Sequence, residues 1–141
     1  MSLYDDVQTM IIDDQKFRDL NKNNILDIYE DHRLDAETRS EDLLNLMTID
    51  EKIGQMFHPP FILKPDFFMI LYEIAIRGNK LTETQIVDDN ITHFNLYGNP
   101  SPFELGVKIN HLQKIASKTR LGIPITISLS LIHISEPTRP Y

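Results

Sequence analysis

Cysteine is absent from this chain of 141 residues, which excludes disulfides, thiolate zinc sites and cysteine nucleophiles. Long apolar runs are also missing, since none approaches the ~20 residues that a membrane-spanning helix needs. Positive charge is scarce, because 14 Lys and Arg stand against 21 Asp and Glu and leave a net charge of −7. Surfaces that bind nucleic acid concentrate Lys and Arg. The sequence therefore predicts neither a membrane nor a nucleic acid as a partner.

The N-terminus carries Asp5 and Asp6, where a secretory signal peptide would carry positive charge. If Met1 is the true start, we expect a soluble chain without a signal peptide, and the lack of cysteine does not decide its compartment. Apolar residues make up 41% and charged residues 25% of the chain, which is an ordinary globular composition. The length suits a single domain with a core of normal size.

Two short helices are predicted between residues 35 and 56. Asp35 is a suitable N-cap for the first helix. Thr48 and Glu51 have the spacing of a capping box at the start of the second helix, in which each side chain accepts a hydrogen bond from a backbone N–H. Apolar residues recur on one side of each helix, and we expect these stripes to lie in the core. They are Leu43, Leu44, Leu46 and Met47 in the first helix and Ile49, Ile53 and Met56 in the second.

The second half of the chain predicts a βαβ unit. The segment HPPF at 58–61 interrupts the helical pattern, and residues 61–81 are apolar but irregular, so we expect helix or loop there. The segment ITHFNLYG at 91–98 predicts a short strand that ends in a turn. A helix is predicted from about Pro102 to Lys118, and RLGIPITIS at 120–128 predicts a turn and a second strand. Strand, helix and strand in this order indicate a parallel sheet with a covering helix.

The segment DLNKNNILDIYE at 19–30 places oxygen-bearing side chains at the ligand positions of an EF-hand calcium loop. That loop takes ligands at positions 1, 3, 5, 7, 9 and 12, with a backbone carbonyl at position 7 and a bidentate Glu at position 12. Calcium accepts such a set because it tolerates about six to eight hard oxygens in flexible geometry. The candidate ligands of a structural calcium ion are Asp19, Asn21, Asn23, the Ile25 carbonyl, Asp27 and Glu30.

The same segment has a second interpretation without an ion. Position 6 is Asn24 rather than the usual Gly, although Asn enters the left-handed region more easily than most residues. The flanks fit a helix–loop–helix pattern less well, because DDQKF at 13–17 predicts only a weak helix and residues 32–34 do not form an evident one. In this alternative, Asx side chains cap local turns and Leu26 packs inward. Both interpretations remain open at this point.

Four segments together resemble glycoside hydrolase family 3, the family of β-glucosidases and related exo-glycosidases. They are DLNKNNILDIYED, RSEDLLNLMTIDEKIGQM, ITHFNLYGNPSPFEL and INHLQKIASKTRLGIPITIS, in the order of the family's N-terminal region. The resemblance covers roughly residues 17–128. It implies an α/β fold, namely an incomplete N-terminal portion of a (β/α)8 TIM-type barrel with about two strands and their flanking helices. A complete barrel of this type takes ~250 residues.

The resemblance also indicates what this chain lacks. Family members are retaining enzymes with an Asp nucleophile and a separate acid/base, both downstream of the second strand, and retention needs the two carboxyl groups about 5–5.5 Å apart. Neither has a counterpart here. The family also places a sugar-binding Asp just after the second strand, whereas Ser128 is followed by LSLIHISEPTRPY. The resemblance therefore implies none of the family's catalytic residues in this chain.

Polar residues near the predicted first strand have two interpretations each. His93 lies within that strand, and we expect a packed or hydrogen-bonded residue rather than a base, since the five histidines share no metal-ligand spacing. Asn95, Tyr97 and Asn99 lie near its end, and barrel sites form at the C-terminal ends of strands. In one interpretation, these three residues face a sugar pocket. In the other, which we favour, Asn99 caps the turn before Pro100.

We expect three parts in the chain. Residues 1–34 are an N-terminal extension with the EF-hand-like loop at 19–30, and residues 35–128 are the start of the barrel. Residues 129–141 are an artefactual tail, because SLIHISEPTRPY resembles a conceptual translation of sequencing-adapter DNA.

The expected function is that of a fragment of a retaining β-glucosidase-type hydrolase. The parent enzyme would release terminal non-reducing β-D-glycosyl residues from a carbohydrate substrate without a catalytic cofactor, and the isolated chain is expected to be inactive. The alternative is a calcium-binding module without catalytic activity. We favour the hydrolase fragment, because a calcium-binding module would not explain the segments that resemble the barrel.

Overall fold

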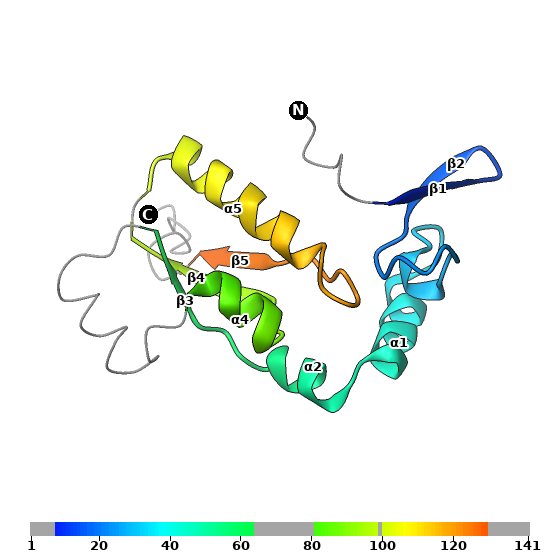
Figure 1. The fold of residues 1–141 in the computed structure, drawn as a ribbon, viewed down its shortest axis with the longest axis horizontal. Helices are drawn as coiled ribbons and strands as arrows, with labels where there is room; N and C mark the ends of the chain where they lie inside the picture. The colour runs from blue at the N-terminus through cyan, green and yellow to red at the C-terminus, as the bar shows by residue number, and fades with distance from the viewer. Residues whose placement is uncertain (1–7, 64–80, 99, 130–141) are drawn as a thin grey trace, which may run out of the picture.

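A hairpin opens the described part of the chain. The computed structural model describes residues 8–63, 81–98 and 100–129, and β1 (Thr9–Ile12) pairs antiparallel with β2 (Gln15–Arg18) (Figure 1). Asp13 and Asp14 have φ angles of 51° and 59°, which is the backbone of a two-residue type I′ turn. The prediction of a weak helix at 13–17 is therefore wrong, because Asp tolerates the left-handed region and here closes a hairpin.

The two helices predicted after residue 35 are confirmed. Loop 19–30 ends in a 3-10 helix, η1 (Ile28–Glu30), and is followed by α1 (Ala36–Leu46) and α2 (Ile49–Gly54). The Asp35 side chain accepts a hydrogen bond from Thr38 N at 2.9 Å. Thr48 and Glu51 form the expected capping box, with Thr48 N 2.8 Å from a Glu51 carboxylate oxygen.

The apolar stripes of α1 and α2 are exposed for the most part. Met47 is buried, but Leu44, Ile49 and Met56 are 51%, 74% and 82% exposed. The prediction that these stripes lie in the core is therefore wrong for most of their residues. Periodicity identifies the apolar face of a helix, but it does not say which element covers that face.

Three strands form a parallel sheet. They are β3 (Pro60–Ile62), β4 (His93–Tyr97) and β5 (Thr126–Leu129), in the order β3-β4-β5. The two predicted strands, β4 and β5, are confirmed. The third, β3, was not predicted, because HPPF was interpreted only as a break, although proline is compatible with the first position of a strand. Residues 64–80 of the irregular segment, and the predicted tail apart from Leu129, lie outside the described residues.

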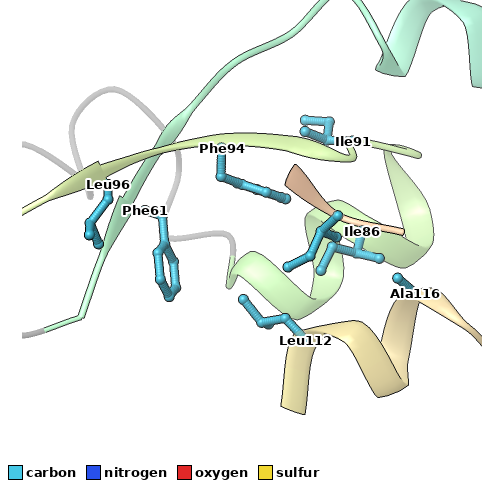
Figure 2. Packing of buried hydrophobic residues seen from close by; sticks show 8 residues of the cluster. Phe61, Ile86, Ile91, Phe94, Leu96, Leu112 and Ala116 are labelled. Atoms are coloured by element: carbon cyan, nitrogen blue, oxygen red, sulfur yellow. The ribbon is translucent and has the colours of Figure 1, made fainter. Parts of the chain in front are cut away.

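Two helices cover one face of this sheet. The predicted helix is confirmed as α5 (Pro102–Ala116), which starts at a capping box of Ser101 and Glu104 and completes the βαβ unit. The other helix, α4 (Thr82–Asp88), was not anticipated. Figure 2 shows the side chains packed between these helices and the sheet. The buried cluster consists of Phe61, Ile86, Ile91, Phe94, Leu96, Leu112, Ala116 and Ile125.

These elements make a mixed α/β structure with a small parallel sheet. In Figure 1 the hairpin and α1 lie at one end, the sheet with α4 and α5 lies at the other, and α2 lies between them. Within the described ranges, no helix has both the length and the apolar character needed to cross a membrane.

The N-terminal unit (residues 9–34) contacts the α5–β5 loop (residues 117–125). The Tyr29 hydroxyl donates to the Leu121 carbonyl at 3.3 Å. Burial, together with the negative charge of Glu30, raises the pKa of this hydroxyl above its ordinary value. Gly122 completes the contact, because a Cβ there would lie 2.5 Å from the Leu20 carbonyl oxygen.

A second link joins the same loop to α2. Arg120 Nε lies 2.9 Å from a Glu51 carboxylate oxygen, and Arg120 Nη2 donates to the Leu46 carbonyl at 2.9 Å. Hydrogen bonds from Arg120, with help from the N–H of Thr48, hold the pKa of Glu51 below its ordinary value. The ion pair therefore ties the first turn of α2 to the loop that leads into β5.

This ion pair predicts a pH dependence of stability. Because the pKa of Glu51 is lower in the folded than in the unfolded chain, the unfolded chain binds more protons in acid. The stabilisation is fully present above the unfolded pKa of about 4.3 and is lost as the pH falls through the folded pKa. Arg120→Gln should raise the pKa of Glu51 in an NMR titration and reduce this acid sensitivity in urea unfolding. Lys52→Gln, an equal charge change on exposed α2 surface, is the control. An unchanged Glu51 pKa in Arg120→Gln would contradict the assignment.

Candidate functional site

One face of the three-stranded sheet carries polar side chains. Figure 2 shows Phe94 on the side of β4 where Ile86 and Leu112 lie, which is the face that α4 and α5 cover. Side chains alternate between the two faces along a strand, so His93, Asn95 and Tyr97 share the opposite face. The core residues of β4 are buried, whereas Tyr97 is 46% exposed. The alternating pattern of β4 therefore separates a core face from a polar face.

Residues from the neighbouring strands join this polar face. The parallel register places Ser128 of β5 beside Asn95 of β4. Ser128 Oγ lies 2.8 Å from Nε2 of His58, which precedes β3, and 3.3 Å from Asn95 Oδ1. The rings of His58 and His93 meet edge to face with their centroids 6.5 Å apart. We call His58, His93, Asn95, Tyr97 and Ser128 the polar-face cluster.

The hydrogen bonds within the cluster indicate where its protons lie. A serine hydroxyl has one proton to donate and can also accept. When His58 Nε2–H donates to Ser128 Oγ, the Ser128 hydroxyl has two acceptors in reach, Asn95 Oδ1 at 3.3 Å and the Phe94 carbonyl at 3.4 Å. The amide nitrogen of Asn95 then keeps both of its protons for other acceptors.

The tautomer of His93 follows from a second chain of hydrogen bonds. Gln55 Nε2 donates to the Asn90 carbonyl at 3.2 Å, which fixes the orientation of the Gln55 amide. Gln55 Oε1 consequently accepts the proton of the Thr92 hydroxyl. Thr92 Oγ1 lies 2.9 Å from His93 Nδ1 and has no second proton, so the imidazole must donate there. In neutral His93, Nε2 is therefore an acceptor.

The cluster is suited to hydrogen bonding rather than to acid–base hydrolysis by carboxylates. Its members are imidazole, amide, phenol and hydroxyl groups, and none is an Asp or Glu. Among the residues that the structure describes, no three or more His, Asp or Glu side chains come together as a metal site. The arrangement can thus bind a neutral polar ligand through fixed donors and acceptors.

The structure brings together only some of the residues that the sequence singled out. His93 is hydrogen-bonded, which confirms its predicted role. Asn95 lies with Tyr97 on the polar face, and Asn99 lies outside the described residues. His58 and Ser128 were missed, because no local pattern links two residues separated by 70 positions.

The candidate calcium loop is closed by bonds to its two buried carboxylates. Asp19 accepts from the backbone N–H groups of Asn23 at 3.1 Å and Asn24 at 2.9 Å. Glu30 accepts from Leu20 N at 2.6 Å. Asn24 has a φ angle of 63°, so position 6 adopts the left-handed backbone for which calcium loops use Gly.

The loop amides are also engaged within the loop. Asn21 and Asn23 donate through Nδ2 to Asp27 Oδ2 at 2.6 and 2.8 Å. Their Oδ1 atoms accept from the N–H two residues further on, at 3.1 Å for Asn23 N and 2.7 Å for Ile25 N. These are Asx turns. The turn interpretation thus accounts for the bonds present, and the calcium site stays a prediction.

The chain is similar in sequence to several β-glucosidases, although no protein-family model matches it. It is 38% identical over 116 residues to β-glucosidase C of Emericella nidulans, across 82% of this chain and 18% of that protein. It is 37% identical over 114 residues to the periplasmic β-glucosidase/β-xylosidase of Dickeya chrysanthemi, across 79% of this chain and 17% of that protein. The probable β-glucosidase C of Aspergillus oryzae is 35% identical over 116 residues, across 79% of this chain and 17% of that protein.

The matches thus extend over about four-fifths of this chain, whereas the chain spans less than a fifth of the length of these relatives. Over most of its length, the chain is therefore related in sequence to proteins named β-glucosidases.

Proposed function

We propose that this chain is part of a retaining glycoside hydrolase of family 3, which releases terminal non-reducing β-D-glycosyl residues. The observation that carries the proposal is the identity of 35–38% to proteins named β-glucosidases over most of the chain. The parallel β4–α5–β5 unit supports it, because repeated units of this kind build a (β/α)8 barrel. Sheet β3-β4-β5 would then form the first strands of that barrel.

The residues that would carry out the hydrolysis are not among those of the polar-face cluster. Retaining hydrolysis needs two carboxyl groups about 5–5.5 Å apart, one as nucleophile and one as acid/base. The polar-face cluster supplies neither carboxylate. We therefore expect the isolated 141-residue chain to leave β-glycosides intact, and we assign both carboxylates to the part of the enzyme that the relatives have beyond the matched region.

Reading the genomic DNA past the codon for Ser128 and expressing the complete frame tests the proposal. We expect the frame to continue with an Asp shortly after β5 in place of the residues at 129–141, and then with the rest of a barrel. The purified product should hydrolyse an aryl β-glucoside or β-xyloside, whereas the 141-residue chain should not. A stop codon directly after Tyr141, or a complete product without turnover of either glycoside, would overturn the proposal.

The second candidate is calcium binding by loop 19–30, as a structural site. Its support is the left-handed backbone of Asn24 at the position where the loop template needs it. The donor set is also chemically suitable, because it offers carboxylate, amide and carbonyl oxygens. Binding would require Asn21 and Asn23 to exchange their contacts with Asp27 for contacts to the ion.

Calorimetry on the EDTA-treated chain tests this candidate. We expect heat of binding at millimolar calcium or below, and roughly tenfold weaker binding after Glu30→Gln, because the charge count of the ligands sets the affinity. Glu37→Gln on exposed α1 is the matched control. Circular dichroism would verify that each variant is folded. No heat at millimolar calcium would remove the calcium site and leave the Asx turns as the whole role of the loop.

A further inference from the structure

A surface pocket lies between the N-terminal unit, α1 and the loop before β5. Its volume is about 440 Å³, which is within the range of small-molecule sites in proteins. In Figure 1 the loop between α5 and β5 extends toward α1 and the hairpin. None of the lining residues belongs to the sheet β3-β4-β5, so completing a barrel from that sheet would not turn the pocket into barrel interior.

Three basic side chains line this pocket, namely Lys16 and Arg18 of β2 and Arg39 of α1. Arg39 Nε donates to the Tyr29 carbonyl at 3.0 Å, which fixes the position of the guanidinium. Among the residues that the structure describes, neither the terminal nitrogens of Arg39 nor the Lys16 ammonium has an acceptor. In a chain with a net charge of −7, the pocket is therefore a local positive region with N–H donors to spare.

The lining also contains one acidic residue, Glu30, whose carboxylate is already occupied. It accepts from the backbone N–H groups of Leu20 at 2.6 Å, Asn21 at 3.3 Å and Asp27 at 3.3 Å. These bonds direct the carboxylate toward loop 19–30. Within the described ranges it forms no ion pair with Lys16 or Arg39, so both cations can bind another anion.

Apolar side chains provide much of the remaining lining. They are Leu20 of the N-terminal unit, Leu43 of α1, and Ile123 and Pro124 of the loop before β5. Small-molecule sites are usually apolar, with a few polar groups that fix the orientation of the ligand. An inorganic anion would leave this apolar surface uncovered, and a neutral apolar ligand would leave the cations unpaired. The lining thus suits an acidic group attached to an apolar body.

We propose that this pocket binds a small organic anion. Its carboxylate or phosphate group would accept from Arg39 and Lys16, while its apolar body would lie against Leu43 and Ile123. The planar guanidinium matches both kinds of acidic group, and hydrogen bonds between charged partners are roughly twice as strong as neutral ones. The site does not depend on the proposed hydrolase function, because no residue of the polar-face cluster takes part in it.

Calorimetry and NMR titration of the 141-residue chain test the site with four probes. We expect benzoate and phenyl phosphate to bind in the millimolar range, and the tighter of the two identifies the acidic group. Benzyl alcohol lacks the charge and inorganic phosphate lacks the apolar body, so each should bind at least about tenfold more weakly. The methyl signals of Leu43 and Ile123 should shift with the aryl anions, whereas that of Ile49 on exposed α2 should not. Binding of neither aryl anion to the folded chain, or binding no tighter than that of benzyl alcohol, would overturn the proposal.

Three variants locate the charge that binds. Arg39→Gln should weaken the aryl anions by about tenfold, because hydrogen bonds to charged groups are the stronger ones. Lys16→Gln should weaken them several-fold, whereas Lys52→Gln, an equal charge change on exposed α2, should not. Circular dichroism would verify the fold of each variant. If Arg39→Gln does not fold, Lys16→Gln decides the matter, since Lys16 is exposed and its loss leaves the packing intact. Equal affinities in Lys16→Gln and Lys52→Gln would exclude the site.

Discussion

Phe94→Ala is expected to lower the free energy of unfolding by about 3–5 kcal/mol, the usual cost of removing a buried aromatic side chain. Phe94 has no exposed surface and lies in the middle strand of the sheet, in the cluster that joins β3 and β5 to α4 and α5. Truncation leaves a cavity that strands on both sides cannot fill by a local shift. Urea unfolding followed by circular dichroism measures the change.

Phe103→Ala is the matched control, because Phe103 is 80% exposed in the first turn of α5. Substitutions at such surface positions usually change stability by less than about 0.5 kcal/mol. The pair removes the same atoms from two environments. Equal losses for the two variants would contradict the packing described for the sheet.

Gly54→Ala is expected to lower the free energy of unfolding by about 1–3 kcal/mol or more, through overpacking. A Cβ on Gly54 would lie 2.4 Å from the Asn90 carbonyl oxygen and 2.6 Å from that of Asp89. Both are backbone atoms in the turn before β4, so they cannot rotate away like a side chain. The last turn of α2 would have to separate from that turn, and the thermal midpoint should fall accordingly.

Gly106→Ala should have the opposite sign. Gly106 lies inside α5, and a Cβ there would meet nothing within 4 Å. Ala is favoured over Gly in a helix interior by roughly 0.5–1 kcal/mol, so this variant should be more stable than the wild type. Thermal unfolding of both glycine variants checks the two directions together. Stabilisation by both substitutions would show that α2 does not pack on the turn at 89–90.

The parts of the fold that could be predicted are those with a local physical cause. Capping boxes at Thr48 and Ser101 are set by residues three positions apart, and the first of them was predicted with its helix. Alternation around Phe94 predicted β4, and the 3.6-residue period predicted α5. Each of these signals lies within one element, so the sequence alone contains it.

The parts that could not be predicted depend on residues far apart in the chain or on backbone that few residues adopt. The hairpin turn needs left-handed angles at Asp13 and Asp14, which DDQKF does not reveal. Strand β3 is only three residues long and starts with Pro60. Its composition therefore does not indicate a strand, and only its pairing with β4 in the structure shows that it is one. The hydrogen bond of His58 to Ser128 likewise exists only because the sheet brings β3 and β5 to either side of β4.

The contact of Leu20 and Tyr29 with Leu121 and Gly122 also sets the order in which a newly made chain can fold. Tyr29 and Leu121 are separated by 92 positions, so the N-terminal unit leaves the ribosome long before this loop exists. At about 5–20 residues per second, the delay is roughly 5–18 seconds. During that interval Tyr29 lacks its contact with Leu121. The N-terminal unit can therefore contact α1 early, through Arg39 and Asp42, whereas its contact with the loop before β5 forms only after that loop has emerged.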